Sequence, residues 1–243
     1  MNILETKNLK KSFGGVHAIS DLSISFAKGK LTSVIGPNGS GKTTLVNVLT
    51  GMHAITGGAV VVGGKSFHAI RPESLPRLGI TRTFQDVRLF EQMTVADNIM
   101  VALTARGPLA ALLERGSADR EERVKAVLEK IGLWEKRREL AYNLSYGQRK
   151  LVEIGRVLAM DVDIVLLDEP FAGLFKEMVR VIVGIIGELK AAGKTVLLIE
   201  HNMELIRELS DHVIVMDAGG LLAKGKPDEV LARRDVIEAY LGE

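Results

Sequence analysis

Residues 36–43 read Gly36-Pro37-Asn38-Gly39-Ser40-Gly41-Lys42-Thr43, and this stretch decides the fold of the chain. It matches G-x-x-x-x-G-K-[ST] at every fixed position. The glycines let the backbone curl so that successive N–H groups point at phosphate oxygens. Lys42 supplies a positive charge for β and γ phosphates, and the Thr43 hydroxyl can ligate Mg²⁺. We therefore predict that residues 36–43, the phosphate loop, bind the phosphate tail of a nucleotide.

The flanks of the phosphate loop predict a strand before it and a helix after it. The apolar run Leu31 to Ile35 is typical of a buried strand, and the stretch Thr43 to Leu49 has a helical pattern. The positive N-terminal end of that helix adds to the attraction for phosphate. A chance glycine loop with a surface lysine would not carry both flanks, so the context favours a true phosphate site.

Two acidic residues follow a second apolar run. Ile164 to Leu167 indicates a buried parallel strand, and Asp168 and Glu169 come directly after it. Ligands bind at the carboxyl ends of strands in open α/β sheets. We expect Asp168 to hold the Mg²⁺ shell and Glu169 to polarise a water for in-line attack on the γ-phosphate. The alternative, a strand-end turn with solvated charges, explains the acids alone but not their occurrence with the phosphate loop.

The order of strand and helix patterns predicts the fold class α/β. Residues 3–5 and 22–26 alternate like strands, and glycine pairs enclose a short β region at residues 59–62. Residues 94–160 are helical in pattern. Strand and helix patterns then alternate, which argues for βαβ units, in the segments Ile164–Leu167, Lys176–Ala192, Thr195–Ile199, Asn202–Leu209 and Val213–Met216. We predict a P-loop NTPase core of mainly parallel sheet, with an N-terminal antiparallel β subdomain and an inserted helical subdomain.

Composition excludes several classes of protein. The 243 residues suffice for one sizeable domain. The net charge of +2, from 32 basic and 30 acidic residues, argues against a nucleic-acid partner. The chain has no cysteine, which excludes disulfides, thiolate catalysis and zinc–sulfur sites. Its longest apolar stretches, such as Val181–Leu189, fall short of the roughly 20 residues that span a bilayer. Any work at a membrane therefore requires another protein to span it.

A further motif carries a family resemblance. Leu144-Ser145-Tyr146-Gly147-Gln148, followed by a helical run, resembles the L-S-G-G-Q signature of ATP-binding cassette (ABC) proteins. The resemblance implies that Ser145, Gly147 and Gln148 contact the ATP held by an opposite subunit, so that the nucleotide lies at a dimer interface. The positive end of a helix suits such a contact. Ser145 as a simple helix N-cap is the plainer alternative, and both can hold together.

The same resemblance implies roles at other positions. Phe13 matches the aromatic residue that stacks on adenine, although core packing is the alternative. Gln85 matches the glutamine that touches Mg²⁺ and water, and His201 matches the histidine that contacts the γ-phosphate. The implied catalytic residues are Glu169, His201 and Gln85, and the implied metal ligands are Thr43, Gln85 and Asp168. The implied nucleotide-binding residues are Phe13, Gly36, Pro37, Asn38, Gly39, Ser40, Gly41, Lys42, Thr43, Thr44, Ser145, Gly147 and Gln148.

The resemblance covers residues 4–243, which implies a single ABC ATP-binding domain. We expect its helical subdomain at about 90–160 and a short helical tail at about 227–243. The implied cofactors are ATP and Mg²⁺. The implied partners are a second ATP-binding subunit, identical or not, two integral membrane permeases and, indirectly, a solute-binding protein. These partners imply a peripheral position on the cytoplasmic face of the cell membrane. We expect residues 85–93 to contact the permeases, with Leu89, Phe90 and Met93 forming either an exposed docking patch or ordinary core.

A narrower resemblance points to the solute. Tyr146 in the signature, the stretch Phe171 to Leu174 and the ending Asp235 to Glu243 are similar to the branched-chain (hydrophobic) amino-acid uptake group. This implies a subunit that powers import of branched-chain amino acids. The alternatives are an ABC ATPase for another solute (urea, amide or lipid export), or a soluble ABC ATPase of DNA repair or translation. A P-loop kinase would not explain the signature, and a sensor without hydrolysis would not explain Glu169 with His201.

One loop departs from the family pattern. Family members usually follow Gly-Leu with Asn or Asp and then Pro, whereas here Leu174 runs straight into Phe175-Lys176-Glu177, about one residue short. In the family this loop crosses the dimer interface and helps position the attacking water. The sequence therefore leaves the interface geometry and the hydrolysis rate open at this loop.

Overall fold

The structure of the protein is a computed structural model that describes residues 1–103 and 117–241. Its internal contacts divide the chain into two compact units. Unit 1 comprises Met1–Arg82, Val162–Glu169 and Ile185–Glu243, and unit 2 comprises Thr83–Asp161 and Pro170–Gly184. The helical subdomain predicted at about 90–160 stays a prediction, and its residues 104–116 lie outside the described residues, as do residues 242–243 of the predicted tail.

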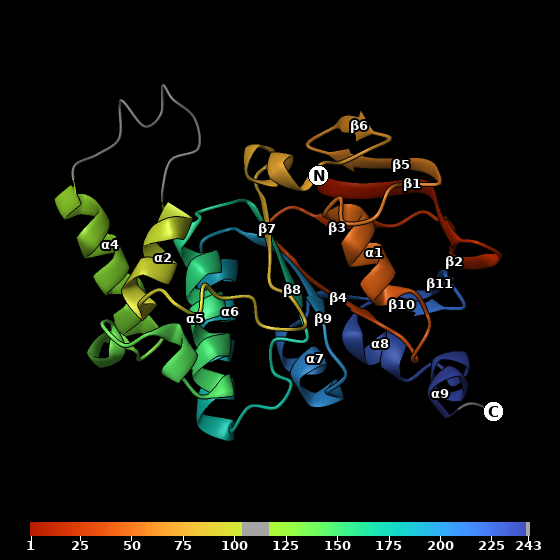
Figure 1. Cartoon of the computed structure of the whole chain (residues 1–243). Helices are drawn as coiled ribbons and strands as arrows, with labels where there is room; N and C mark the ends of the chain where they lie inside the picture. The colour runs from red at the N-terminus through yellow and green to blue at the C-terminus, as the bar shows by residue number, and fades with distance from the viewer. Residues whose placement is uncertain (104–116, 242–243) are drawn as a thin grey trace. The chain divides into compact units, whose positions relative to one another are not determined.

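Unit 1 contains an antiparallel sheet built from the N-terminal part of the chain. Its strands run in the order β2-β1-β5-β6, with β3 also paired to β1 (Figure 1). The strands are β1 (Asn2–Phe13), β2 (Val16–Leu22), β3 (Ser25–Ala27), β5 (Gly57–Val62) and β6 (Lys65–Phe67). The alternation at residues 22–26 predicts one strand, but the chain ends β2 at Leu22 and begins β3 at Ser25. Register explains the difference, because Leu22 pairs with Leu9 whereas Ser25 pairs with Glu5.

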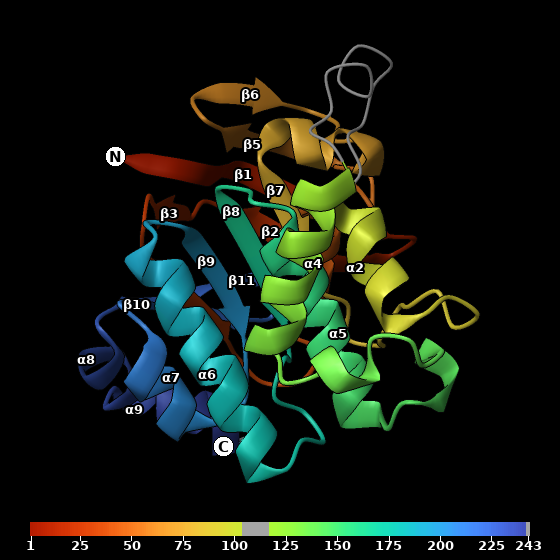
Figure 2. The same cartoon turned by 90° about the vertical axis from the view of Figure 1, so that its left-hand side faces the viewer.

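The second sheet of unit 1 is mainly parallel, as the sequence predicts. Its order is β11-β10-β4-β9-β8-β7, and only β10 and β11 pair antiparallel. Figure 2 shows β8 and β9 side by side. β4, β8 and β9 are buried along their whole length, which their continuous apolar sequences require. The strands are β4 (Leu31–Ile35), β7 (Ile80–Arg82), β8 (Ile164–Asp168), β9 (Thr195–Ile199), β10 (His212–Asp217) and β11 (Gly220–Gly225).

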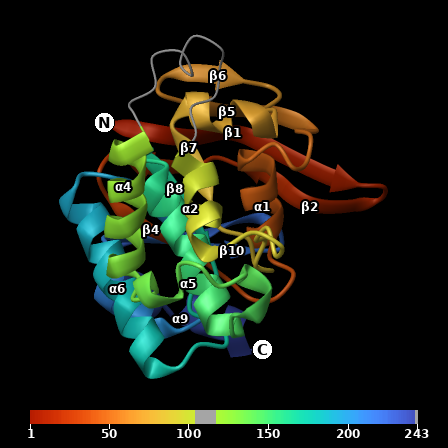
Figure 3. The ribbon, with the colours of Figure 1, turned by 60° about the vertical axis from the view of Figure 1, so that its left-hand side comes forward.

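Helices complete both units. In unit 2, α2, α4 and α5 pack against one another (Figure 3). Val124, Leu128 and Ile131 are buried, so α4 and the residue after it turn apolar side chains toward the interior of this unit. The helices are α1 (Lys42–Leu49), α2 (Val95–Leu103), α4 (Ser117–Lys130), α5 (Tyr146–Ala159), α6 (Lys176–Ala191), α7 (Met203–Leu209), α8 (Pro227–Leu231) and α9 (Arg234–Leu241). Short 3₁₀ turns are η1 (Pro72–Leu78), η2 (Trp134–Lys136) and η3 (Ala141–Asn143).

Unit 1 has two clusters of buried apolar side chains. The larger cluster joins residues of both sheets with α1, and it includes Leu4, Phe26, Leu45 and Leu166. Full burial of such a side chain contributes about 1.5–3 kcal/mol. The smaller cluster packs the C-terminal helices on β4 and β10, and its members are Ile35, Ile206, Val213, Val215, Ala223, Val230 and Val236. Ile35 is the last residue before the phosphate loop, so this cluster reaches the edge of the predicted nucleotide site.

Within residues 1–103 and 117–241, each helix is too short or too polar to cross a bilayer.

Candidate nucleotide site

The phosphate loop connects β4 to α1 in the way that its sequence predicts. The chain leaves the buried strand at Ile35 and enters the helix at Lys42. Gly36 and Gly41 have φ values of +151° and +100°, which side chains other than glycine rarely adopt. A Cβ atom at Gly36 would collide with the Met216 carbonyl oxygen, and one at Gly41 would collide with the Ala18 carbonyl oxygen. Both the backbone conformation and the lack of space therefore require glycine at these two positions.

Lys42 is folded back onto the phosphate loop. Its Nζ donates hydrogen bonds to the carbonyl oxygens of Gly36, at 2.8 Å, and Pro37, at 2.9 Å, and the residue is 6% exposed. Burial lowers the pKa of the Lys42 ammonium, and the charges of Glu169 and Asp168 oppose that change. Two carbonyl oxygens thus hold the Lys42 ammonium by hydrogen bonds, and the charges of Asp168 and Glu169 favour its protonated form. This arrangement orients a positive charge where the sequence predicts the β and γ phosphates.

The predicted catalytic acid and histidine meet at the ends of two neighbouring strands. In the β8–β9 ladder Asp168 pairs with Ile199, so the residues that follow both strands emerge at the same edge. Glu169 has a φ of +48°, unusual for a non-glycine residue, and its N–H donates to the Ile199 carbonyl oxygen. His201 Nε2 lies 3.2 Å from Glu169 Oε1. Backbone strain of this kind occurs where the surroundings fix a side chain for function.

Arg82 is a member of the site that sequence reasoning missed. Its guanidinium forms an ion pair with Asp168 Oδ2 at 3.3 Å, and both side chains are almost fully buried. The same guanidinium donates to Asn47 Oδ1 at 2.8 Å and to Thr50 Oγ1 at 2.9 Å. Arg82 therefore ties the acidic end of β8 to α1, the helix that follows the phosphate loop. No motif marks this residue in the sequence, because its partner Asp168 lies 86 positions away.

Glu200 holds the turn that presents His201. Its Oε1 accepts hydrogen bonds from the N–H groups of His201, at 3.0 Å, and Asn202, at 3.2 Å. Its Oε2 is buried without a hydrogen-bond partner in the described structure. The Asn202 side chain in turn caps α7. In the sequence, only the place of Glu200 directly before His201 could have indicated that it holds this turn.

Phe13 lies at the end of β1, where the sequence predicts an adenine-stacking residue. The residue is 43% exposed, so core packing, the alternative reading, does not describe it. Its ring meets the His53 ring edge-on, with 5.0 Å between centroids, and Lys11 Nζ lies 4.5 Å from its centroid. An accessible aromatic face is compatible with stacking on a base, and the stacking itself stays a prediction.

The residues predicted to bind Mg²⁺ have suitable chemistry. Thr43 is exposed at the start of α1, and Asp168 is a buried carboxylate at the end of β8. Within the described residues no group of three or more His, Asp or Glu gathers as a metal cage. Mg²⁺ at nucleotide sites usually takes one or two protein oxygens and completes its shell with phosphates and water. One hydroxyl and one carboxylate therefore fit this ion.

Unit 2 carries the signature residues at the start of α5. The Ser145 Oγ accepts from the Gln148 N–H at 3.3 Å, and the Gln148 Oε1 accepts from the Ser145 N–H at 3.1 Å, which forms a capping box. The N-cap reading of Ser145 is thus confirmed, and the nucleotide contact stays a prediction. A Cβ at Gly147 would collide with the Met178 side chain. Glycine is required there by the close approach of the segment that begins α6.

Gln85 belongs to unit 2 and is held by its backbone. Lys150, which is fully buried on α5, donates long hydrogen bonds to the carbonyl oxygens of Phe84, at 3.5 Å, and Gln85, at 3.4 Å. Glu153 Oε1 accepts from the Phe84 N–H at 2.9 Å. Burial raises the pKa of the Glu153 carboxyl, and the Phe84 N–H and Lys150 lower it by less. The helix that begins at the signature therefore fixes the segment that presents Gln85, a link that the sequence did not reveal.

The shortened loop after Pro170 contacts the signature. Gly173 has a φ of +71°, and a Cβ there would lie 3.2 Å from the Tyr146 ring. Phe175, where the family pattern has a polar residue and proline, is 77% exposed. In the predicted docking patch Phe90 is 47% exposed, and Leu89 and Met93 are partly exposed. The docking role of the patch stays a prediction.

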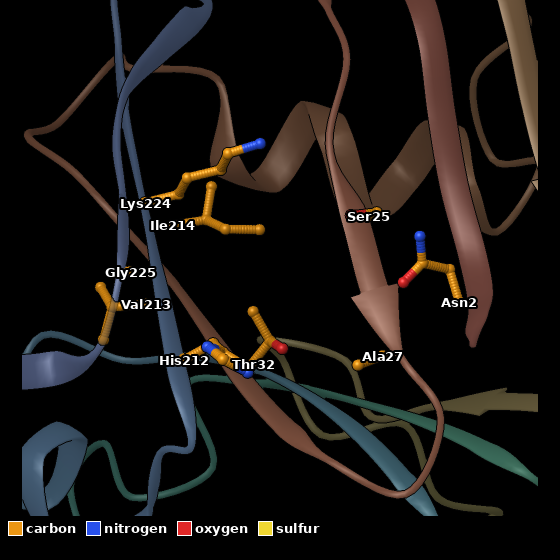
Figure 4. A pocket seen from close by; sticks show the side chains of 9 residues that line it. All are labelled: Asn2, Ser25, Ala27, Thr32, His212, Val213, Ile214, Lys224 and Gly225. Atoms are coloured by element: carbon orange, nitrogen blue, oxygen red, sulfur yellow. The ribbon is translucent and has the colours of Figure 1, made fainter.

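A cavity of about 380 Å³ lies elsewhere in unit 1 (Figure 4). Thr32, near the amino end of β4, and His212, at the amino end of β10, line it together with Lys224 of β11. The phosphate loop follows the carboxyl end of β4. Strand direction therefore separates this cavity from the nucleotide site.

Comparison with known proteins agrees with this geometry. A family model described as ABC transporter matches residues 19–172, and one described as branched-chain amino acid ATP-binding cassette transporter matches residues 221–243. The high-affinity branched-chain amino acid transport ATP-binding protein LivG of Salmonella typhimurium is 38% identical over 99% of this chain and 98% of its own. A nucleotide-free ATP-binding cassette from an ABC transporter has a TM-score of 0.87 at 37% identity, covering all of both chains. The ADP conformation of an ABC transporter cassette has a TM-score of 0.86, also at 37% identity and full coverage.

Proposed function

Since this chain belongs to the ATP-binding cassette (ABC) transporter family, we propose that it is the ATP-hydrolysing subunit that powers import of branched-chain amino acids. The observation that supports ATP hydrolysis is the buried Lys42 ammonium. Two carbonyl oxygens of the phosphate loop orient it, and the charges of Glu169 and Asp168 raise its pKa against the effect of burial. The solute rests on the similarity to LivG over nearly the whole of both chains.

The residues of unit 1 have complementary parts in the reaction. Lys42 and the N–H groups of the phosphate loop bind the β and γ phosphates. Thr43 and Asp168 would hold Mg²⁺, which neutralises the charge that develops on the phosphate oxygens. Glu169 accepts a proton from water as the water oxygen attacks the γ-phosphorus in line. The bond from that phosphorus to the bridging oxygen breaks, which releases ADP and phosphate.

Two such subunits would close over two ATP molecules. Ser145, Gly147 and Gln148 of one copy would face the nucleotide bound by the other, and this bridging exists only in the closed dimer. A ligand shifts a conformational equilibrium only through its different affinities for the two states, and the bridging contact supplies that difference. Hydrolysis removes the bridge, so the dimer opens. Partner membrane permeases, contacted through the region of Gln85 to Met93, would convert this cycle into transport at the cytoplasmic face of the membrane.

Uptake by intact cells tests the proposal. Deleting the gene should stop ATP-dependent accumulation of labelled leucine, isoleucine and valine, and leave urea uptake unchanged. The wild-type chain should restore uptake. Glu169→Gln should not, because it retains ATP binding but lowers hydrolysis on the order of a hundredfold or more. Unchanged branched-chain uptake in the deletion strain would refute the solute, and near-normal ATP turnover by Glu169→Gln would remove Glu169 from the mechanism.

A further inference from the structure

The first residue of the phosphate loop makes a contact with the far end of the chain. The Gly36 N–H donates a hydrogen bond to the Tyr240 hydroxyl oxygen at 2.7 Å, across 204 positions of sequence. Tyr240 belongs to α9, and it is the only aromatic residue of that helix. Gly36 itself is buried. A buried backbone N–H needs a partner, and here a side chain of the C-terminal helix provides it.

Packing holds the Tyr240 ring in place. The ring lies against the smaller apolar cluster of unit 1, whose members include Ile35, Val213 and Val236. Ile35, a member of this cluster, directly precedes Gly36, so the ring packs against the same cluster that holds the residue before the phosphate loop. Burial raises the pKa of Tyr240 to about 12, and the Gly36 N–H lowers it by less. A phenol is neutral at physiological pH even with its ordinary pKa near 10, so the hydroxyl adds no negative charge beside the phosphate loop.

Both backbone polar groups of Gly36, its N–H and its carbonyl oxygen, form hydrogen bonds with side chains. Its N–H is held by Tyr240 and its carbonyl oxygen accepts from Lys42 Nζ. Gly36 also lies close to the Met216 backbone, because a Cβ atom added to Gly36 would collide with the Met216 carbonyl oxygen. A displacement of Gly36 would therefore move one of the two carbonyl groups that orient the Lys42 ammonium.

We propose that Tyr240 is a positioning residue of the nucleotide site: its hydroxyl fixes Gly36, and through Gly36 it fixes Lys42, so that α9 sets the affinity for ATP. The inference rests on the proposed ATPase function. Without the hydroxyl, the free protein relaxes its loop until the Gly36 N–H reaches water. ATP then binds only after the loop returns to its fixed form, and the population of that form lowers the apparent affinity.

Tyr240→Phe tests this directly, because it keeps the ring and removes only the hydroxyl. We expect the KM for ATP to rise about fivefold to thirtyfold, the scale of one buried donor losing its partner. The kcat should stay within about twofold, since the loop is restored once ATP is bound. Hydrogen exchange should show lost protection of the Gly36 amide in the free variant.

Tyr142→Phe is the matched control. Tyr142 is 65% exposed in unit 2, and its ring contact with Arg149 does not depend on the hydroxyl. Its KM for ATP should equal that of the wild type. A Tyr240→Phe protein with unchanged KM and unchanged Gly36 protection would overturn the inference, as would a lower melting temperature with unchanged KM. A wild-type protein that fails to bind ATP would instead refute the proposed function.

Discussion

At the level of single residues, the buried charges of unit 1 depend on one another. Asp168 forms an ion pair with the buried guanidinium of Arg82, and its charge also raises the pKa of Lys42. Removing one partner of a buried ion pair leaves the other charge in a site where water cannot solvate it. The Arg82–Asp168 pair thus maintains a carboxylate in the interior, where the proposed magnesium chemistry needs it.

Arg82→Ala should destabilise the protein strongly. The variant leaves the Asp168 carboxylate buried without its guanidinium and removes the hydrogen bonds to Asn47 and Thr50. We expect the free energy of unfolding, measured by urea titration, to fall by about 3–5 kcal/mol. Arg234→Ala is the control, because Arg234 forms its ion pair with Glu238 on the surface and should contribute little. Equal effects of the two substitutions would contradict the importance of the buried pair.

At the level of elements, α5 serves two purposes at its N-terminus. Ser145 caps the helix through its side chain, and the same hydroxyl is proposed to contact ATP held by a second subunit. Deeper in the helix, Lys150 and Glu153 hold the backbone at Phe84 and Gln85. One helix therefore connects the signature to the segment that presents Gln85, and substitutions can separate its two purposes.

Ser145→Ala and Ser145→Asp distinguish capping from nucleotide contact. Alanine removes the cap and should lower the free energy of unfolding by about 1 kcal/mol, whereas aspartate is an equally good cap. Neither variant should dimerise with MgATP in a Glu169→Gln background, because aspartate places a negative charge toward the phosphates. Light scattering measures the dimer. Normal dimerisation of the aspartate variant would reduce Ser145 to a cap alone.

Glu153 should make stability depend on pH. Burial raises its pKa in the folded protein above the ordinary value of 4.5. Between those two values the folded state binds more protons than the unfolded state, so stability falls as pH rises. Glu153→Gln cannot ionise and keeps an acceptor for the Phe84 N–H. Its stability relative to the wild type, from urea unfolding, should therefore be higher at pH 8 than at pH 5. If the variant and the wild type differ in free energy of unfolding by the same amount at pH 5 and at pH 8, the pKa of Glu153 is not raised.

At the level of the whole molecule, the fold was largely predictable from sequence. β4, β8 and β9 are buried on both faces, so their apolar runs mark them clearly. β7 was missed because three residues, Ile80 to Arg82, are too few to show a period. β11 was missed because its sequence, Gly220 to Gly225, has glycine at both ends and no regular alternation of apolar and polar residues. Its pairing with β10 is visible only in three dimensions.

The site was predictable where its residues form a continuous motif. The phosphate loop, Asp168 with Glu169, and the signature are each consecutive in sequence and have a required chemistry. Arg82 and Tyr240 could not be predicted, because their partners lie 86 and 204 positions away. Lys150 was missed for a different reason: a lysine on a helix normally faces water, and this one is fully buried.

Calorimetric titration of the purified protein with ATP tests the central claim most directly. Lys42 is the charge that the phosphate loop is built to orient. We predict saturable, magnesium-dependent binding by the wild type, and an affinity at least about tenfold weaker for Lys42→Ala, since a charge-assisted contact is lost. Absence of saturable binding by the wild type, or equal affinity of Lys42→Ala, would contradict the account.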